Sequence, residues 1–144
     1  LLPVASIVTP NIPEAEVLSG HRIGTVDDMK KAASLIHGLG VKNVVIKGGH
    51  LRQSRKTGSI DILYDGKSYS EFSADWIRTK NTHGTGCTFA AALAAYLAGG
   101  MAMRDAVSEA KALVLKAIKG SLKIGHGHGP VNILVNLNNV RRDK

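Results

Sequence analysis

The segment Asn81-Thr82-His83-Gly84-Thr85-Gly86-Cys87-Thr88 restricts the possible folds of this chain more than any other, because its glycines lead directly into an apolar helical run. Gly84 and Gly86 lack the Cβ atoms that would block a close approach to the backbone. Unpaired N–H groups and the helix dipole favour an anion at the N-terminus of a helix. We therefore predict a phosphate-binding loop at the start of a helix.

Cys87 is the only cysteine of the chain, and it lies in the first turn of this predicted helix. A thiol in that position is stabilised as the thiolate, so Cys87 is a candidate base. The alternative interpretation is a glycine-rich turn before an ordinary core helix, with Cys87 as a small buried hydrophobic residue. Short glycine motifs recur by chance, and other parts of the chain have to agree.

Three further motifs accompany the glycine loop: Thr9-Pro10-Asn11-Ile12-Pro13-Glu14-Ala15-Glu16, Val45-Ile46-Lys47-Gly48-Gly49-His50 and Gly125-His126-Gly127-His128-Gly129-Pro130-Val131-Asn132. Together with residues 80–87, their order and spacing closely resemble the C-terminal portion of hydroxymethylpyrimidine and hydroxymethylpyrimidine phosphate kinases of thiamine biosynthesis. Those enzymes belong to the ribokinase-like superfamily. The resemblance covers nearly the whole chain, and four motifs in one order are far more specific than any one of them.

The resemblance implies an ATP-dependent phosphotransferase that acts on a hydroxymethylpyrimidine and on its monophosphate. Such phosphoryl transfer depends mostly on positioning and charge neutralisation. The loop that contributes Thr82, Gly84, Thr85 and Gly86 would bind the ATP phosphates, and Cys87 would take the substrate proton. Most ribokinase-like sugar kinases place an aspartate at the Cys87 position, whereas the pyrimidine kinases resemble this chain in having cysteine there. We therefore favour the pyrimidine branch.

Two further site assignments follow from the resemblance. Asn11 and Glu14 match an Asn-x-x-Glu motif that orders Mg²⁺ and its waters near the ATP phosphates, and hard oxygen ligands suit that ion. The alternative for Glu14 is a first-turn carboxylate that complements the helix dipole. Lys47, at the end of a predicted strand, resembles the lysine that reaches the ATP phosphates; the alternative is an ordinary exposed lysine. Ligands gather at such strand ends in open α/β sheets.

Members of this family carry a long N-terminal portion ahead of the segment that corresponds to Leu1, with most of the pyrimidine-binding residues. We expect residues 1–144 to be the C-terminal portion of a single kinase domain, inactive by itself. The small-molecule partners would be ATP and a pyrimidine, and the enzyme would be a homodimer. Two alternatives stay open: a pyridoxal or pyridoxine kinase of the related type, and a catalytically incomplete nucleotide-binding fragment.

The formal net charge of +8 raises the question of nucleic-acid binding. The basic residues form small groups without interleaved aromatic residues, so we expect no nucleic-acid partner. The groups are Lys42, Lys47, Arg52, Arg55 and Lys56; Arg78 and Lys80; and the tail residues Arg141, Arg142 and Lys144. The longest apolar stretch, residues 89–98, is too short to span a membrane. We expect a cytoplasmic protein, although a missing N-terminus would hide a targeting segment.

His126 and His128 invite a metal-site interpretation, which we reject. They lie two residues apart in a glycine loop, and no third ligand is spaced to complete a tetrahedral site. His83 lies beside the predicted phosphate loop, and the sequence does not decide its role. We interpret the segment around His126 as a structural loop.

The hydrophobic pattern alternates strands and helices, and the class is therefore α/β. We expect strands at residues 5–9 and 43–47, a hairpin of residues 60–64 and 68–73 around Asp65-Gly66, and helices at residues 13–19, 25–39, 84–98 and 103–119. The continuous apolar run of residues 44–46 suggests burial in a parallel sheet. With the resemblance, we predict a ribokinase-like layered α/β/α fold with a mostly parallel sheet whose N-terminal part is missing.

Overall fold

The computed structural model describes residues 1–51, 58–121, 127 and 129–135, and it divides into two compact units. The first unit comprises residues 1–76 and the second residues 77–144. The elements confirm the predicted α/β class.

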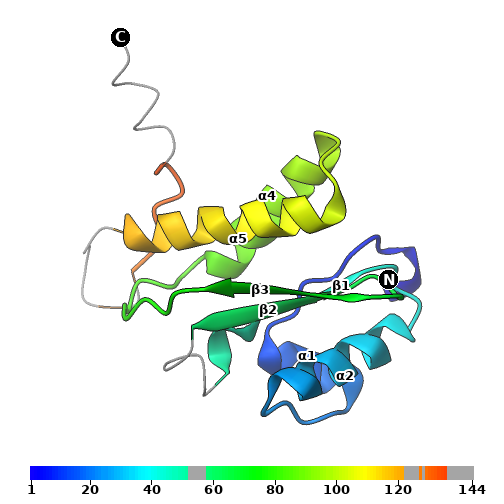
Figure 1. The fold of residues 1–144 in the computed structure, drawn as a ribbon. Helices are drawn as coiled ribbons and strands as arrows, with labels where there is room; N and C mark the ends of the chain where they lie inside the picture. Colours follow the sequence, from blue (N-terminus) through cyan, green and yellow to red (C-terminus); the bar gives the residue numbers. More distant parts are fainter. Residues whose placement is uncertain (52–57, 122–126, 128, 136–144) are drawn as a thin grey trace. The chain divides into compact units, whose positions relative to one another are not determined.

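The first unit contains a three-stranded sheet in the order β1-β2-β3 (Figure 1). β1 spans Val44–Ile46, β2 spans Ser59–Tyr64 and β3 spans Tyr69–Ala74, and both pairings are antiparallel. The hairpin β2-β3 turns at Asp65-Gly66, where Asp65 Oδ1 accepts the N–H groups of Lys67 at 2.8 Å and Ser68 at 2.7 Å. The predicted hairpin is therefore confirmed.

The prediction of a strand at residues 5–9 in a mostly parallel sheet is wrong for the residues that the structure describes. This segment forms only isolated parallel bridges, Val8 with Val44 and, just beyond it, Asn11 with Lys47. The Val45 N–H donates to the Val8 carbonyl and the Lys47 N–H to the Pro10 carbonyl, both at 2.9 Å. Pro10 has no N–H to continue the ladder, so the parallel pairing is interrupted. β1 is buried as predicted, but its strand partner β2 is antiparallel.

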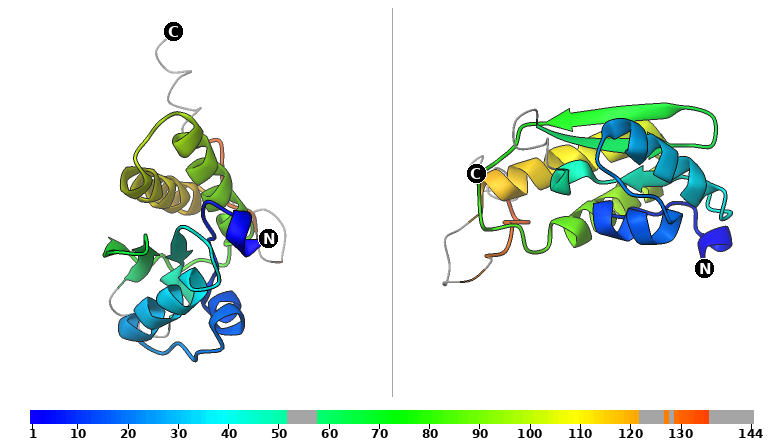
Figure 2. Two further views of the ribbon diagram at one scale, coloured as in Figure 1. Left: turned by 90° about the vertical axis from the view of Figure 1, so that its right-hand side faces the viewer. Right: turned by 90° about the horizontal axis from the view of Figure 1, so that it is seen from below.

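Two helices cover one face of this sheet (Figures 1 and 2). α1 spans Ile12–Ser19 and ends at Gly20, which adopts a left-handed conformation with φ 65°. α2 spans Val26–His37 and ends two residues earlier than predicted. It begins with the predicted capping box: Thr25 Oγ1 accepts the Asp28 N–H while Asp28 accepts the Thr25 N–H. A short 3-10 turn, η1 at Leu2–Val4, precedes them. These local signals were sufficient to locate both helices.

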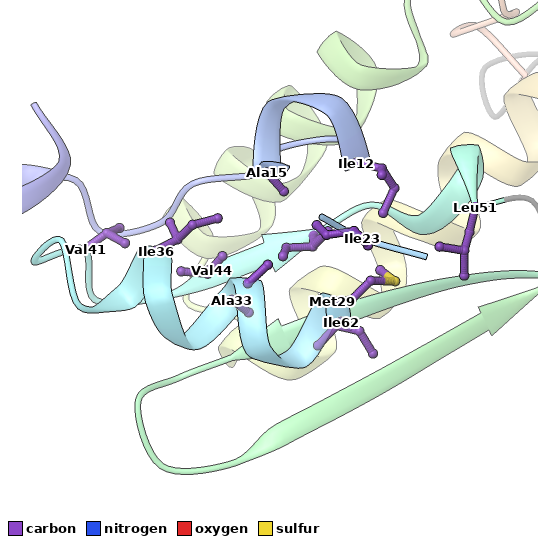
Figure 3. Packing of buried hydrophobic residues seen from close by; sticks show 12 residues of the cluster. Ile12, Ala15, Ile23, Met29, Ala33, Ile36, Val41, Val44, Leu51 and Ile62 are labelled. Carbon is purple, nitrogen blue, oxygen red and sulfur yellow. The ribbon is translucent and has the colours of Figure 1, made fainter. Parts of the chain in front are cut away.

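The core of the first unit lies between α1, α2 and the sheet (Figure 3). Met29 and Ile36 from α2 meet Ile46 from β1 and Ile62 from β2, and all four are fully buried. Burial of each such side chain contributes roughly 1.5 to 3 kcal/mol to folding. The core therefore fixes the C-terminal end of β1 and the N-terminal end of α1. The predicted site residues Lys47 and Asn11 lie next to these two ends.

The second unit contains two helices packed side by side, α4 at Thr85–Ala98 and α5 at Met103–Lys119 (Figure 1). Val107 and Ala110 of α5 are buried, and Gly99-Gly100 lies between the two helices, in the gap left by their predicted ranges. Residues 85–98 are apolar or small at nearly every position, which predicts burial of α4 on nearly every side, and this prediction is wrong. Only Phe89 and Leu93 of α4 are buried, and several of its alanines are exposed. An apolar helix is buried only on the faces that pack against other elements. Within its unit α4 packs against one helix, α5.

None of the helices in the described part of the chain combines the length and the apolar character that a membrane crossing requires.

Candidate functional site

The glycine loop forms the start of α4, as the sequence predicted. Gly84 is the N-cap residue with φ 88°, a left-handed conformation that residues with a Cβ rarely adopt. No side chain caps this helix. The N–H groups of Gly86 and Cys87 therefore lack an acceptor within the helix, as in any first helical turn. Such a turn offers an anion two backbone donors and the positive end of the helix dipole.

Two threonines shape the entry to this turn. The N–H and Oγ1 of Thr85 both donate to the Thr82 carbonyl, at 3.3 and 3.1 Å. Because the Thr85 hydroxyl is used for this contact, Thr82 and Thr85 close the loop on itself. The predicted loop residues Thr82, Gly84, Thr85 and Gly86 thus belong to one turn.

Cys87 is exposed and carries a free thiol. The alternative interpretation, a small buried hydrophobic residue, is therefore wrong. The exposed sulfur lies in the first turn of α4, the turn that also contains the backbone N–H groups of Gly86 and Cys87. The catalytic role of Cys87 stays a prediction.

A segment near the C-terminus pairs with the glycine loop. The His83 N–H donates to the Gly129 carbonyl at 3.3 Å, and the Val131 N–H donates to the His83 carbonyl at 3.1 Å. Gly129 is buried, and a Cβ at this position would overlap the carboxamide oxygen of Asn81. Residues 129–131 of this motif therefore support the loop through their backbone. His126 and His128, which we rejected as metal ligands, lie outside the described residues, as do Arg52, Arg55, Lys56 and the basic tail.

The same segment is tied to the end of α5. The Asn132 N–H donates to the Ala117 carbonyl at 3.0 Å, and Asn132 Nδ2 donates to the Gly120 carbonyl at 3.2 Å. On the other side, Asn81 Nδ2 donates to Ser121 Oγ at 3.3 Å. The glycine loop is thus connected on both sides to the last turn of α5 and the residues directly after it.

In the first unit, Asn11 and Glu14 form a capping box at the start of α1. Glu14 Oε2 accepts the Asn11 N–H at 2.8 Å, and Asn11 Oδ1 accepts the Glu14 N–H at 2.9 Å. The alternative that the sequence left open for Glu14, a first-turn carboxylate at a helix N-terminus, is therefore present. Both side chains supply hard oxygen donors of the kind that suit Mg²⁺. Their metal role stays a prediction.

Lys47 lies beside this capping box. Asn11 and Lys47 are partners in a parallel bridge, so two motifs far apart in the sequence meet at the end of β1. Lys47 is partly exposed. After it, the chain turns through η2 at Gly48–His50. The structure thus brings Asn11, Glu14 and Lys47 together in the first unit, and the residues of the phosphate loop together in the second.

Sequence reasoning missed one residue of this region, Asp61 in β2. The residue is 6% exposed, and its Oδ1 accepts the Gly48 N–H at 2.9 Å. The signal that could have found it is a single carboxylate inside the apolar strand Ile60-Asp61-Ile62-Leu63. Charged residues are almost never buried without a partner.

Two other features of the described residues carry no assignment. No group of three or more His, Cys, Asp or Glu side chains gathers there to hold a metal ion. An open groove of about 590 Å³ runs beside α1, with Val8, Pro10, Pro13, Val17 and Glu14 among its lining residues. Neither Lys47 nor the glycine loop lines it, so it is not the predicted phosphate site.

Comparison with known proteins identifies the family. The family model described as phosphomethylpyrimidine kinase matches residues 1–132. The chain therefore belongs to the phosphomethylpyrimidine kinase family. The resemblance that four motifs indicated is confirmed at this level.

Relatives named as pyrimidine kinases and relatives named as pyridoxine or pyridoxal kinases are both similar to this chain. A hydroxymethylpyrimidine/phosphomethylpyrimidine kinase of Bacillus subtilis is 46% identical over 92% of the chain and 48% of the relative. A putative pyridoxine kinase of Staphylococcus aureus is 45% identical, with the same two coverages of 92% and 48%. A solved structure of the S. aureus pyridoxal kinase in complex with AMP-PCP matches with a TM-score of 0.88 and 43% identity, over 94% of this chain and 50% of that one. The chain thus spans about half the length of these relatives.

Proposed function

We propose that this chain is part of an ATP-dependent kinase that phosphorylates 4-amino-5-hydroxymethyl-2-methylpyrimidine and its monophosphate in thiamine biosynthesis. The observation that carries the proposal is the exposed Cys87 in the uncapped first turn of α4, within a chain of the phosphomethylpyrimidine kinase family. The base would then act on the substrate hydroxyl, and the backbone donors would bind the oxygens of the phosphoryl group that this hydroxyl attacks.

In this mechanism the Cys87 thiolate takes the proton of the substrate hydroxymethyl group. The hydroxyl oxygen forms a bond to the γ-phosphorus of ATP, and the bond from that phosphorus to the bridging oxygen breaks to release ADP. Backbone N–H groups of Gly86 and Cys87 stabilise the charge that develops on the transferring phosphoryl oxygens. Thr82, Gly84 and Thr85 keep the loop in the conformation that presents these donors.

Two further roles, at Lys47 and at the Asn11–Glu14 pair, belong to this proposal. Lys47 would neutralise the ATP phosphates, and Asn11 and Glu14 would hold Mg²⁺, in part through water. Mg²⁺ supplies charge neutralisation at the phosphates when it is bound. The AMP-PCP complex of the S. aureus relative supports adenine-nucleotide binding in this family.

We also propose the wider setting of this kinase. The complete domain would be a ribokinase-like layered α/β/α fold with a mostly parallel sheet, of which residues 1–144 form the C-terminal portion. It would act as a cytoplasmic homodimer, with no nucleic-acid or membrane partner. The support is the family membership and the match to about half the length of its relatives.

A pyridoxal or pyridoxine kinase is the second candidate. The observation that favours it is the similar identity of the relatives with either name, 46% and 45%. The distinguishing experiment measures kcat/KM of the full-length protein for hydroxymethylpyrimidine, its monophosphate and pyridoxal, with Mg²⁺ and ATP. Preferential turnover of both pyrimidines is expected. Preferential turnover of pyridoxal would favour the second candidate, and ATP binding without turnover of any substrate would indicate a nucleotide-binding protein.

A further inference from the structure

Asp61 is a buried carboxylate to which the proposed mechanism gives no role. It is 6% exposed and lies between Ile60 and Ile62 in β2, where an apolar residue would be expected. Ionised groups are costly to bury unless hydrogen bonds compensate for the lost hydration. A carboxylate at this position is therefore explained best by a contact that an apolar side chain would not provide.

The contact is with the turn that follows Lys47. Asp61 Oδ1 accepts the Gly48 N–H at 2.9 Å, and this hydrogen bond is buried. Hydrogen bonds to a charged acceptor are roughly twice as strong as neutral ones. A Cβ at Gly48 would overlap the carbonyl oxygen of Ile60, so the backbone of this turn lies directly against β2. Asp61 and Gly48 together fix the distance between the turn and the strand.

The other side of Lys47 is also fixed. Its own N–H donates to the Pro10 carbonyl at 2.9 Å, next to the Asn11 bridge. The peptide groups before and after the Lys47 Cα are thus both held by hydrogen bonds, one to Pro10 and one to Asp61. Two fixed peptide planes determine the backbone angles of Lys47, which are φ −84° and ψ 113°. They therefore determine the direction in which its side chain leaves the backbone.

We propose that Asp61 is a positioning residue for nucleotide binding: it holds the peptide after Lys47 so that the Lys47 ammonium group points to the ATP phosphates. In this proposal Asp61 acts on nucleotide binding through the Gly48 N–H and the backbone of Lys47. This inference rests on the proposed function of Lys47 as a phosphate-binding residue. A residue that only stabilises the fold would weaken ATP binding whether or not Lys47 is present. A residue that positions Lys47 should weaken ATP binding only when Lys47 is present.

The test is a double-mutant cycle in the full-length protein that carries this chain. The dissociation constant for ADP and the KM for ATP are measured in the wild type and in Asp61→Ala, Lys47→Ala and the double variant. Asp61→Ala should weaken both by about 10-fold, as expected for a lost charge-assisted hydrogen bond. In the Lys47→Ala background, Asp61→Ala should have almost no further effect, since residues that act as one unit are not additive.

Two variants separate positioning from general stability. Asp61→Asn keeps an oxygen that accepts the Gly48 N–H but lacks the charge, so nucleotide binding should weaken by roughly threefold. It also serves as the second arm of the cycle if Asp61→Ala fails to fold. Ile62→Val removes one methyl group from the adjacent core residue, and it should lower the melting temperature without changing the ADP dissociation constant.

The outcomes separate this inference from the proposed function. Weakened ADP binding by the Asp61 variants only when Lys47 is present supports the inference, even if the wild type phosphorylates neither pyrimidine nor pyridoxal. Unchanged ADP binding in a folded Asp61→Ala or Asp61→Asn protein overturns it, even if the wild type is an active pyrimidine kinase. Equal weakening with and without Lys47 also overturns it, because Asp61 would then act on the fold and not through Lys47.

Discussion

Asn11 pairs with Lys47 in a parallel bridge, and the Lys47 N–H donates to the carbonyl of the residue before Asn11 at 2.9 Å. Asn11 at the same time accepts the Glu14 N–H through its side chain. A capping box at the start of α1 and a lysine at the end of β1 are thus parts of one backbone arrangement. A displacement of the helix start should therefore affect the lysine as well.

The capping box allows the metal role of Glu14 to be tested separately from its structural role. Glutamine also caps at this position of the box, so Glu14→Gln should keep the helix start while it removes the charge. We expect unchanged urea denaturation and a several-fold increase in the Mg²⁺ concentration for half-maximal activity of the full-length protein.

Two further variants control this measurement. Asp27→Asn changes an exposed carboxylate in the first turn of α2 and should leave the Mg²⁺ titration unchanged. Glu14→Ala removes the side chain that accepts the Asn11 N–H, which is one of the two hydrogen bonds of the capping box, and should lower the free energy of unfolding by about 1 kcal/mol. If Glu14→Gln has the Mg²⁺ titration of the wild type, Glu14 is only a capping residue.

The capping box of α2 predicts a dependence of stability on pH. Hydrogen bonds from the Thr25 side chain and the Gly24 backbone lower the pKa of Asp28. Because the pKa in the folded state lies below the unfolded value of about 3.9, ionised Asp28 stabilises the fold above that pH. The stabilisation is lost as the pH falls through the folded pKa. Asp28→Asn should lower the urea midpoint at about pH 7, and the difference from the wild type should shrink at about pH 3. A difference independent of pH would exclude the charge as its cause.

Signals within a few residues of one another were sufficient to predict several elements. Thr25 and Asp28 lie three residues apart and predicted the start of α2, and Asp65-Gly66 predicted the β2-β3 turn. Both depend on backbone groups in the same short segment. The glycine loop was predicted for the same reason, because Gly84 is adjacent in sequence to the helix turn that it begins.

Contacts between distant segments could not be predicted in this way. The apolar pattern of residues 5–9 resembles a strand, but Pro10 removes the donor that would continue its pairing with β1. Asp61 was missed because its partner, the Gly48 N–H, lies in another segment. The pairing of His83 with Pro130 likewise has no signal in either sequence motif alone. Such contacts become visible only when the burial and the partners of each residue are known.

The pairing of the glycine loop with the C-terminal motif can be tested at Gly129. A Cβ there would overlap the Asn81 carboxamide, so Gly129→Ala should lower the free energy of unfolding by roughly 1 to 3 kcal/mol. Gly127→Ala is the matched control, because a Cβ at that position meets nothing within 4 Å. The double variant Gly129→Ala, Asn81→Ala should recover part of the loss. Equal urea midpoints for the two single variants would show that Asn81 moves aside at no cost.

The role of Cys87 as the base makes the most direct prediction about chemistry. Its exposed thiol lies in the first turn of α4, where the loop backbone and not the side chain of residue 87 offers donors to the phosphates. Cys87→Ala in the full-length protein should therefore lower kcat by about 100-fold or more, the usual contribution of a general base, and leave the ADP dissociation constant nearly unchanged. Gly86→Val provides the opposite case, since a β-branched side chain in this turn should weaken the binding of the non-hydrolysable ATP analogue AMP-PCP, which keeps the γ-phosphate. Steady-state kinetics and calorimetric titration of both variants separate the two effects. Full turnover by Cys87→Ala would remove Cys87 from the mechanism and leave the loop as a phosphate-binding element alone.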